Sequence, residues 1–357
     1  MNSLLNKLMS EATRLTQAGN LQAATEAIKS ALAAHLPGMS GHDDRTVDVQ
    51  AREVGGAAAR VGTAGATGAA DAQPAAAAGR FIDGGYGDAN GSREYKLFIP
   101  PGAGQGRALP LVVMLHGCTQ DADDFATGTR MNQLALAGDV FVLYPRQSRK
   151  ANGTRCWNWF VPAHQQRGAG EPAVIAGMTR AVMKEHGIDP ARVYVAGLSA
   201  GGAMAAICGA AYPELFAAVG VHSGLPVGAA SDAGSAFAAM SGGAPVHARP
   251  QHAPPTIVFH GDQDSTVSPI NGERVAAASA GGLAPERVLG SAGHRDITRR
   301  LWRDGAGRVV TEHWLVHGEG HAWLGGDARG SYASAAGPDA SKEMLRFFLE
   351  HRLAGDR

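Results

Sequence analysis

The chain has 357 residues, of which 45% are hydrophobic and 18% charged, so it can bury a full core and has room for an appendage beside one catalytic domain. Its 32 basic residues balance its 32 acidic residues, which argues against nucleic-acid binding and favours neutral substrates. No apolar run approaches the ~20 residues that span a bilayer. The first residues, MNSLLNK, are interrupted by polar groups before a signal-peptide core forms, so we expect a cytoplasmic protein by default.

Residues 3–35 carry two amphipathic stripes and are predicted to form a helical hairpin. The first stripe ends at Ala18-Gly19-Asn20, the second runs from Leu21 to His35, and Pro37 stops it. The pair resembles a single tetratricopeptide unit, but no second copy follows. We therefore expect residues 1–37 to form a hairpin that either pairs with a partner or a second subunit, giving a homo-oligomer, or packs on its own chain.

Residues 38–79 have the composition of a linker. Between Ala57 and Ala78 there are 12 alanines and no large apolar side chain except valine. Such a segment cannot drive the packing of a core, so we predict that it is disordered.

From residue 80 onwards, strand and helix patterns alternate at short intervals. We expect strands near 93–99, 110–116, 139–144, 192–198, 217–222, 255–260 and 309–316, and helices near 121–137, 171–187, 200–211, 271–280 and 338–353. This alternation predicts that residues 80–357 form one α/β domain with a doubly wound, mostly parallel sheet. Reactive groups are then expected at the carboxyl ends of the strands.

The strongest motif is a serine between a strand and a helix. A β-branched run, Arg192 to Ala196, leads into Gly197-Leu198-Ser199-Ala200-Gly201, and helix-forming residues follow. In this setting the motif predicts a nucleophile elbow, because glycines on both sides permit the sharp turn that lifts the serine out of the sheet. The alternative is a glycine-rich loop whose serine only caps a helix. The flanking strand and helix favour Ser199 as a nucleophile.

A serine nucleophile needs a base and an acid, which in this fold follow it in the order Asp, His. The strand at 255–260 runs into His260-Gly261-Asp262-Gln263-Asp264, where two aspartates compete for the acid role. We favour Asp264, which occupies the acid position of an HGxxDxxV pattern. Asp262 is expected to cap or brace the turn.

The base is expected in the glycine turn after the last strand. There, Gly318-Glu319-Gly320 precedes His321, whereas His313 and His317 belong to the strand and are expected to be packed or on the surface. The sequence therefore predicts His321 as the general base. None of the other histidines has metal-ligand spacing, so we expect neither a metal nor a cofactor.

The tetrahedral intermediate also needs hydrogen-bond donors for its oxyanion. Two backbone amides are available for this role. One belongs to Ala200, directly after the nucleophile, and the other to Cys118, in the turn His116-Gly117-Cys118 after the strand at 110–116.

Several segments together resemble the polyhydroxybutyrate depolymerase family of esterases, over residues 80 to 350. They are HGCTQ (116–120), CWNWF (156–160), RGAGEP (167–172), GLSAGGAM (197–204) and GHAW (320–323). The resemblance implies an α/β-hydrolase that cleaves esters, either hydroxyalkanoate oligomers and polyesters or acetylated and feruloylated plant carbohydrates.

The resemblance also implies roles for individual residues. It suggests that Trp157 and Trp159 contact the substrate, and we extend this expectation to Trp323; core packing is the alternative. It further suggests a disulfide between Cys118 and Cys156, which suits an oxidising compartment and so conflicts with the absent export signal.

Two features bear on substrate access. Only a few residues follow the last predicted helix, so we expect no carboxyl-terminal polymer-binding domain, and soluble esters, oligomers or amorphous polymer are favoured over crystalline polyester. Residues 225–254 form an insertion that is expected to act as a lid or a cleft wall.

Two competing functions stay open at this point. A serine peptidase would use the same three residues, but no gating domain that selects peptides is recognisable. A non-catalytic binding protein, docking a partner through the hairpin, is disfavoured by the intact set of Ser199, Asp264, His321 and the HG turn.

Overall fold

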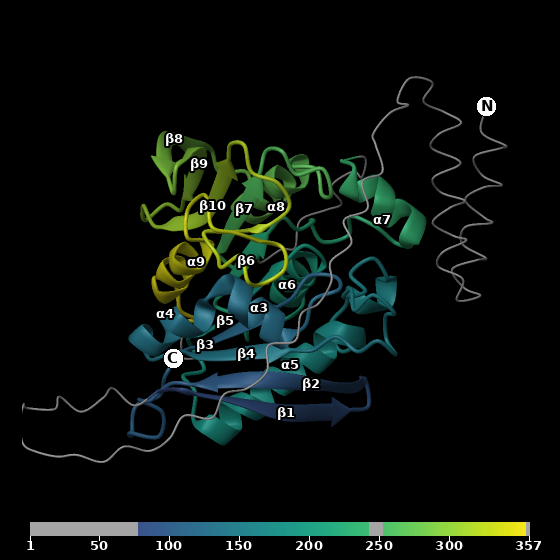
Figure 1. The fold of residues 1–357 in the computed structure, drawn as a ribbon, viewed down its shortest axis with the longest axis vertical. Coiled ribbons are helices and arrows are strands. Elements are labelled where there is room, and N and C mark those ends of the chain that lie inside the picture. The colour runs from purple at the N-terminus through teal and green to yellow at the C-terminus, as the bar shows by residue number, and fades with distance from the viewer. Residues whose placement is uncertain (1–77, 243–252, 355–357) are drawn as a thin grey trace, which may run out of the picture. The chain divides into compact units, whose positions relative to one another are not determined.

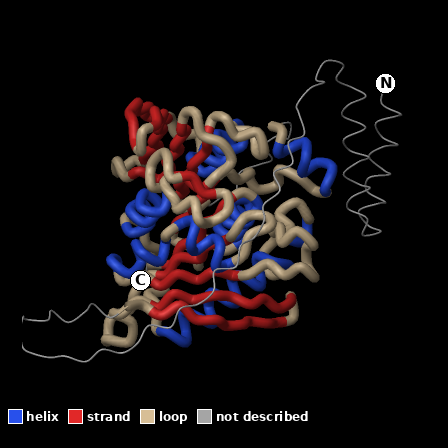
Figure 2. The backbone as a smooth tube through the Cα atoms, viewed as in Figure 1, coloured by secondary structure: helices blue, strands red, loops and turns tan. Residues whose placement is uncertain are grey.

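The computed structural model describes residues 78–242 and 253–354, so the predicted hairpin and nearly all of the predicted linker lie outside the described residues. The described residues build one sheet of ten strands in the order β1-β2-β4-β3-β5-β6-β7-β10-β9-β8 (Figures 1 and 2). Its strands are β1 (Arg80–Asp88), β2 (Gly91–Ile99), β3 (Leu111–Leu115), β4 (Phe141–Pro145), β5 (Val193–Leu198), β6 (Ala218–His222), β7 (Thr256–Gly261), β8 (Pro285–Ala292), β9 (Arg295–Arg303) and β10 (Val309–Val316).

The six central strands run parallel; they are β4, β3, β5, β6, β7 and β10. An antiparallel hairpin extends each edge of the sheet, β1 with β2 on one side and β8 with β9 on the other. Two short strands, β11 (Trp323–Leu324) and β12 (Ala333–Ser334), pair separately. The predicted doubly wound, mostly parallel α/β sheet is therefore confirmed.

Helices cover both faces of the sheet. On one face α5 (Gly170–His186) and α6 (Ala200–Ala211) pack on the strands, and α8 (Ile270–Ala280) packs beside β7 and β10. The other face carries α3 (Ala122–Thr129), α4 (Met131–Gly138) and α9 (Ala340–Leu349). The remaining helices are α7 (Ala233–Met240) and a 3-10 turn, η1 (Pro162–His164).

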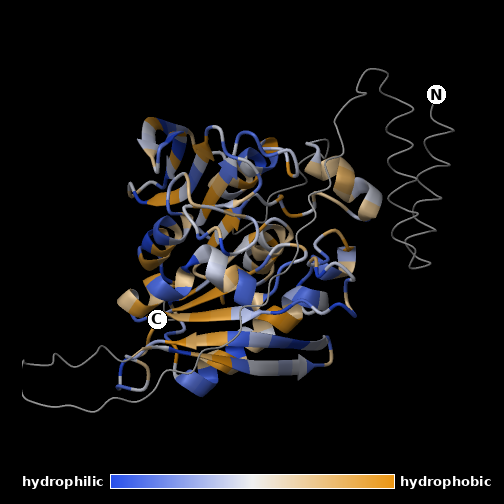
Figure 3. Ribbon diagram, viewed as in Figure 1, coloured by the Kyte–Doolittle hydropathy of each residue, from blue (hydrophilic) through white to orange (hydrophobic). Residues whose placement is uncertain are grey.

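The central strands are apolar on both sides because both faces are covered, and Figure 3 shows hydrophobic residues running along them. In β3 the alternation divides the core in two. Leu111, Val113 and Leu115 point into the core under α5 and α6, while Val112 and Met114 point into the core under α3, α4 and α9. All five side chains are fully buried.

The strand order reverses between β3 and β5. From β3 the chain moves to β4 on one side and then returns to β5 on the other. At such a switch point the loops after the two strands separate and leave a crevice at their carboxyl ends, where ligands bind in open α/β sheets. The turn at 116–120 follows β3 and Ser199 follows β5, so the fold brings both motifs to this crevice.

Several expected elements differ from the structure. The helix predicted at 121–137 is wrong as one element, because Arg130 takes a left-handed conformation (φ 54°) and divides it into α3 and α4. The strands β1, β8 and β9 were not expected. The predicted insertion at 225–254 contains α7, which was not expected either.

No helix among residues 78–242 and 253–354 is both long enough and apolar enough to cross a membrane.

Candidate active site

Ser199 sits at a strained elbow between β5 and α6. Its backbone adopts φ 57° and ψ −120°, a conformation that a serine tolerates only where the surroundings enforce it. Close packing provides that enforcement: a Cβ atom on Gly197 would lie 2.4 Å from the carbonyl carbon of Gly201, and one on Gly201 would lie 2.1 Å from the carbonyl oxygen of Leu115. Only glycine fits at either position, so the turn holds Ser199 at the amino end of α6.

Asp264 and His321 form a hydrogen-bonded pair at the carboxyl ends of the central strands, the same end at which Ser199 lies. His321 Nδ1 lies 2.7 Å from Asp264 Oδ2, and Asp264 Oδ1 accepts the amides of Thr266 (2.9 Å) and Val267 (2.8 Å). Burial alone would raise the pKa of Asp264, but the hydrogen bonds from His260 and His321 outweigh it and lower the pKa below its ordinary value. The carboxylate is therefore ionised at neutral pH and fixes the ring of His321.

The two candidate aspartates have different partners. Asp262 Oδ2 bonds to His317 Nδ1 at 2.8 Å, and its Oδ1 accepts the amide of Gly318 at 2.8 Å. Asp262 thus braces the turn after β10, as the sequence predicts, and Asp264 is the carboxylate bonded to His321.

The segments that carry Ser199 and His321 meet across His222, at the end of β6. The carbonyl of His222 accepts the Ser199 amide at 2.9 Å, and its ring stacks on Trp323 with centroids 5.1 Å apart. His222 Nε2 accepts the Leu324 amide at 3.2 Å. Burial, together with the nearby His260 and His321, lowers the pKa of His222 well below its ordinary value, so this ring is a neutral spacer.

Within the described residues, the Ser199 hydroxyl makes no hydrogen bond to His321. Catalytic hydrogen bonds are often long in the absence of substrate and tighten in the complex.

The turn after β3 lies against Ser199. A Cβ atom on Gly117 would come 3.7 Å from Ser199 Cβ, and the Gly117 amide donates to Gln120 Oε1 at 2.9 Å. The buried His116 fixes the same turn: its Nε2 accepts the Gln147 amide at 3.1 Å, so Nδ1 carries the proton and donates to the Gly117 carbonyl at 2.7 Å. Burial lowers the pKa of His116 to about 4, which keeps the ring neutral.

The two predicted oxyanion donors are available. Neither the amide of Cys118 nor that of Ala200 has an acceptor of its own among the described residues. Cys118 lies two residues beyond His116 in the fixed turn, and Ala200 is the first residue of α6.

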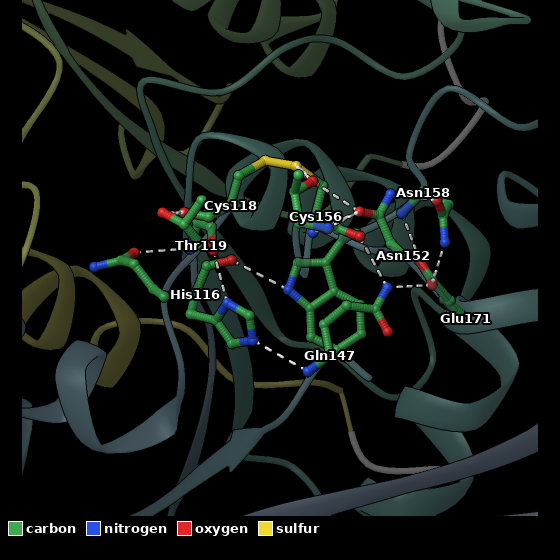
Figure 4. Close-up of a disulfide and its surroundings, with 12 residues drawn as sticks. His116, Cys118, Thr119, Gln147, Asn152, Cys156, Asn158 and Glu171 are labelled. Carbon is green, nitrogen blue, oxygen red and sulfur yellow. Dashed lines mark hydrogen bonds between the residues drawn. A yellow bond between two sulfur atoms is a disulfide. The ribbon is translucent and has the colours of Figure 1, made fainter. Parts of the chain in front are cut away.

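The disulfide that the resemblance implies is present between Cys118 and Cys156 (Figure 4). It ties the turn at 116–120 to the segment 154–158, and two hydrogen bonds reinforce the link. The Thr119 amide donates to the Thr154 carbonyl at 2.7 Å, and Trp157 Nε1 donates to the His116 carbonyl at 3.1 Å. The position of the Cys118 amide is therefore fixed from outside its own strand.

Glu171, at the start of α5, anchors this second segment from below (Figure 4). It is buried and accepts hydrogen bonds from the amide of Asn158 (2.7 Å), from its side chain (2.8 Å) and from Gln147. Arg93 completes the cluster at 3.2 Å. Burial would raise the pKa of Glu171, but the hydrogen bonds from His164, Gln147 and Asn158 lower it. The sequence had no pattern that assigned this role to Glu171.

The three tryptophans expected at the substrate are buried. Trp157 is 0% exposed, Trp159 5% and Trp323 1%. The indole N–H of Trp157 donates to His116, and that of Trp323 donates to Ser341 Oγ at 3.0 Å. They support the loops of the site from beneath, and the structure does not bring their rings to its surface.

Tyr332 is a site residue that the sequence did not reveal. Its ring is 49% exposed and lies edge-on to His321, with centroids 6.4 Å apart. Its neighbour Ser331 accepts a hydrogen bond from Gln120 Nε2 at 2.8 Å. Tyr332 thus lies beside His321, and its neighbour holds the turn at 116–120, although it occurs in a short glycine- and serine-rich stretch without any motif.

These features define a class of protein. The sheet, the elbow after β5, and an acid and a histidine after the later strands are those of an α/β-hydrolase. Residues 93–281 match the family described as esterase PHB depolymerase, and the chain belongs to this family.

Named relatives agree with this assignment. The chain is 38% identical over 178 residues to poly(3-hydroxyalkanoate) depolymerase C of Paucimonas lemoignei, covering 45% of this chain and 42% of that protein. It is 25% identical over 269 residues to acetylxylan esterase A of Aspergillus oryzae, covering 67% of this chain and 86% of that protein. The match therefore spans less than half the length of the depolymerase.

Among solved structures, the acetyl xylan esterase from Aspergillus awamori has a similar fold. It superposes with a TM-score of 0.56 at 21% identity, covering 72% of this chain and 93% of the other. At this identity the likeness supports the fold alone.

Proposed function

We propose that the protein is a serine carboxylic-ester hydrolase that works through an acyl-enzyme. The observation that carries the proposal is the Asp264–His321 pair, bonded at 2.7 Å, at the edge of the sheet where Ser199 occupies its strained elbow. An ionised carboxylate holds His321 with its proton on Nδ1, which leaves Nε2 as the base.

The chemistry follows from these positions. His321 takes the proton of Ser199 as its hydroxyl oxygen attacks the acyl carbon, and the amides of Cys118 and Ala200 stabilise the oxyanion. His321 then protonates the leaving alcohol, and a water activated by the same ring releases the acid and restores the serine.

The substrates proposed are hydroxyalkanoate oligomers or polyester, or other short-chain esters. The family and the Paucimonas lemoignei relative support this class. The acetylxylan esterase relatives support an alternative, esters of acetylated or feruloylated plant carbohydrates. Parallel assays with hydroxybutyrate oligomers, acetylated xylan and feruloyl esters distinguish these two substrate classes.

The test of the proposed reaction is hydrolysis of short-chain nitrophenyl esters together with labelling by a fluorophosphonate. Ser199→Ala is expected to lower kcat on the order of 10⁶-fold and to abolish labelling. Ser265→Ala, in the exposed loop beside Asp264, is the matched control and should keep both. A Ser199→Ala protein that retained most of the rate would end the proposal, and peptide turnover faster than ester turnover would favour a peptidase.

A further inference from the structure

A groove of about 1010 Å³ runs along the edge of the sheet, beside the tip of the β1–β2 hairpin. Its walls are residues 85–87 and 92–94 of the hairpin, residues 146–150 and Arg155 of the loop after β4, and Asp121. Because β2 is antiparallel to β4, with Tyr95 opposite Pro145, the start of β2 lies at the carboxyl end of β4. The groove therefore opens at the carboxyl end of the parallel strands, as Ser199 does.

The groove is basic. Five cationic side chains line it, Arg93, Arg146, Arg149, Lys150 and Arg155, against two carboxylates, Glu94 and Asp121.

Internal ion pairs neutralise three of them. Arg93 lies 3.2 Å from Glu171, Arg146 2.8 Å from Asp123 and Arg155 3.1 Å from Asp121. The side chains of Arg149 and Lys150 are exposed and have no partner in the described part of the chain. The lining also includes the exposed carboxylate of Glu94, 3.7 Å from Arg146, so the positive charge that remains comes from Arg149 and Lys150, although the whole sequence has no net charge. An anion entering the groove would meet an attractive potential.

The loop that carries these two cations is connected to the oxyanion turn. Arg155 Nη1 donates to the Gln120 carbonyl at 3.3 Å, and the disulfide from Cys156 reaches Cys118. The strand order also gives the separation. β4 and β2 are the second and third strands from β5 on this side, so at about 4.8 Å per strand the groove and Ser199 are separated by roughly 10–14 Å across the sheet.

We propose that this groove binds the free carboxylate of an acidic ester substrate, the carboxyl end of a hydroxyacid oligomer. The inference rests on the proposed esterase function. In such an oligomer the fragment with the free carboxylate leaves as the alcohol when an ester bond is cleaved. Each repeat of the oligomer has four backbone atoms. An extended peptide residue, which has three backbone atoms, spans ~3.5 Å, so one repeat spans about 4–5 Å. Two to three repeats then bridge Ser199 and the groove.

The first test measures binding without catalysis. The full-length Ser199→Ala protein is titrated by calorimetry with the linear 3-hydroxybutyrate tetramer, as the free acid and as its methyl ester. The acid is expected to bind about fivefold more tightly at low salt, since two exposed ion pairs contribute modestly, and 1 M NaCl should remove the difference. Adding Arg149→Ala and Lys150→Ala should remove it as well.

A matched control takes the same two residue types from elsewhere. Lys184, near the end of α5, and Arg287, on β8, are exposed and lie outside the groove, so the Lys184→Ala/Arg287→Ala protein should keep the preference for the acid. Equal binding of acid and methyl ester, or a preference that survives the loss of Arg149 and Lys150, overturns the groove proposal.

The second test is kinetic and separates the two proposals. With Ser199 intact, kcat/KM for the acid should exceed that for the methyl ester, and the Arg149→Ala/Lys150→Ala protein should lose this excess while its rate on the neutral methyl ester is unchanged. If both compounds are hydrolysed equally by all variants, the groove proposal fails and the esterase stands. If neither these compounds nor the short-chain nitrophenyl esters are hydrolysed but the binding preference is found, the esterase proposal fails and the groove stands.

Discussion

Among the described residues, two aspartate–histidine pairs join the loop after β7 to the loop after β10. Asp264 bonds to His321 at 2.7 Å and Asp262 bonds to His317 at 2.8 Å, so the hydrogen bonds themselves are nearly identical. Their surroundings differ. The side chains of Asp264 and His321 are 0% and 11% exposed, whereas those of Asp262 and His317 are 27% and 40% exposed. Water screens the second pair much more than the first.

The far nitrogen of each ring makes the larger difference. His317 Nε2 is already bonded to Thr298 Oγ1 at 3.0 Å, while His321 Nε2 has no partner among the described residues. A general base must leave its second nitrogen open to the proton it takes. The comparison teaches that an aspartate beside a histidine does not define a catalytic pair. Under the proposed function, the buried carboxylate of Asp264 and the free far nitrogen of His321 are what suit this pair to act as acid and base.

The most severe way to break the first pair is Asp264→Asn. The Asn side chain has no charge and can donate its N–H to Nδ1, so His321 can switch tautomer, and kcat on nitrophenyl esters should fall about 10⁴-fold. Stopped assays of kcat and KM on the purified variant provide the measurement, with a melting curve to show that it is folded. Activity within tenfold of the wild type would mean that Asp264 is not the acid.

The sequence predicted those parts of the site that depend on local chain geometry. The elbow around Ser199 needs glycine at positions where a Cβ atom would collide with the backbone. A requirement of this kind can be recognised in the sequence itself. The choice of Asp264 over Asp262 rested on position within a motif, and the hydrogen bond to His321 agrees with it.

The sequence could not reveal what depends on tertiary packing. β1 contains three glycines and two aspartates, so its strand propensity is low, and pairing with β2 along its whole length determines its conformation. Tyr332 approaches His321 only because its loop folds back onto the turn at 116–120. The tryptophans of the CWNWF and GHAW segments were expected at the substrate, but their indoles are buried beneath the loops.

Acid pH should remove the contribution of the Asp264–His321 pair to stability. The pKa of Asp264 lies below its ordinary value, so its ionised form stabilises the fold above the unfolded pKa of about 3.9, and this stabilisation is lost as the pH falls through the lower folded value. At pH 6 the Tm of Asp264→Asn should lie roughly 5 °C below the wild type. The gap should close as the pH falls below about 4. A gap that stayed constant down to pH 2.5 would contradict the ionised carboxylate.

The smallest effect is expected from Asp262→Asn. Asp262 holds the Gly318 turn that precedes His321, and its pair with His317 is partly solvated, so the variant should lose less than about threefold in kcat and at most about 3 °C in Tm. The same nitrophenyl-ester assay and melting curve measure both. His317→Ala is the matched control and should give a loss of similar size, since it removes the same hydrogen bond from the other side. A fall of more than 100-fold in kcat for either variant would show that the brace participates in the chemistry, and the functional distinction between the two pairs would be lost.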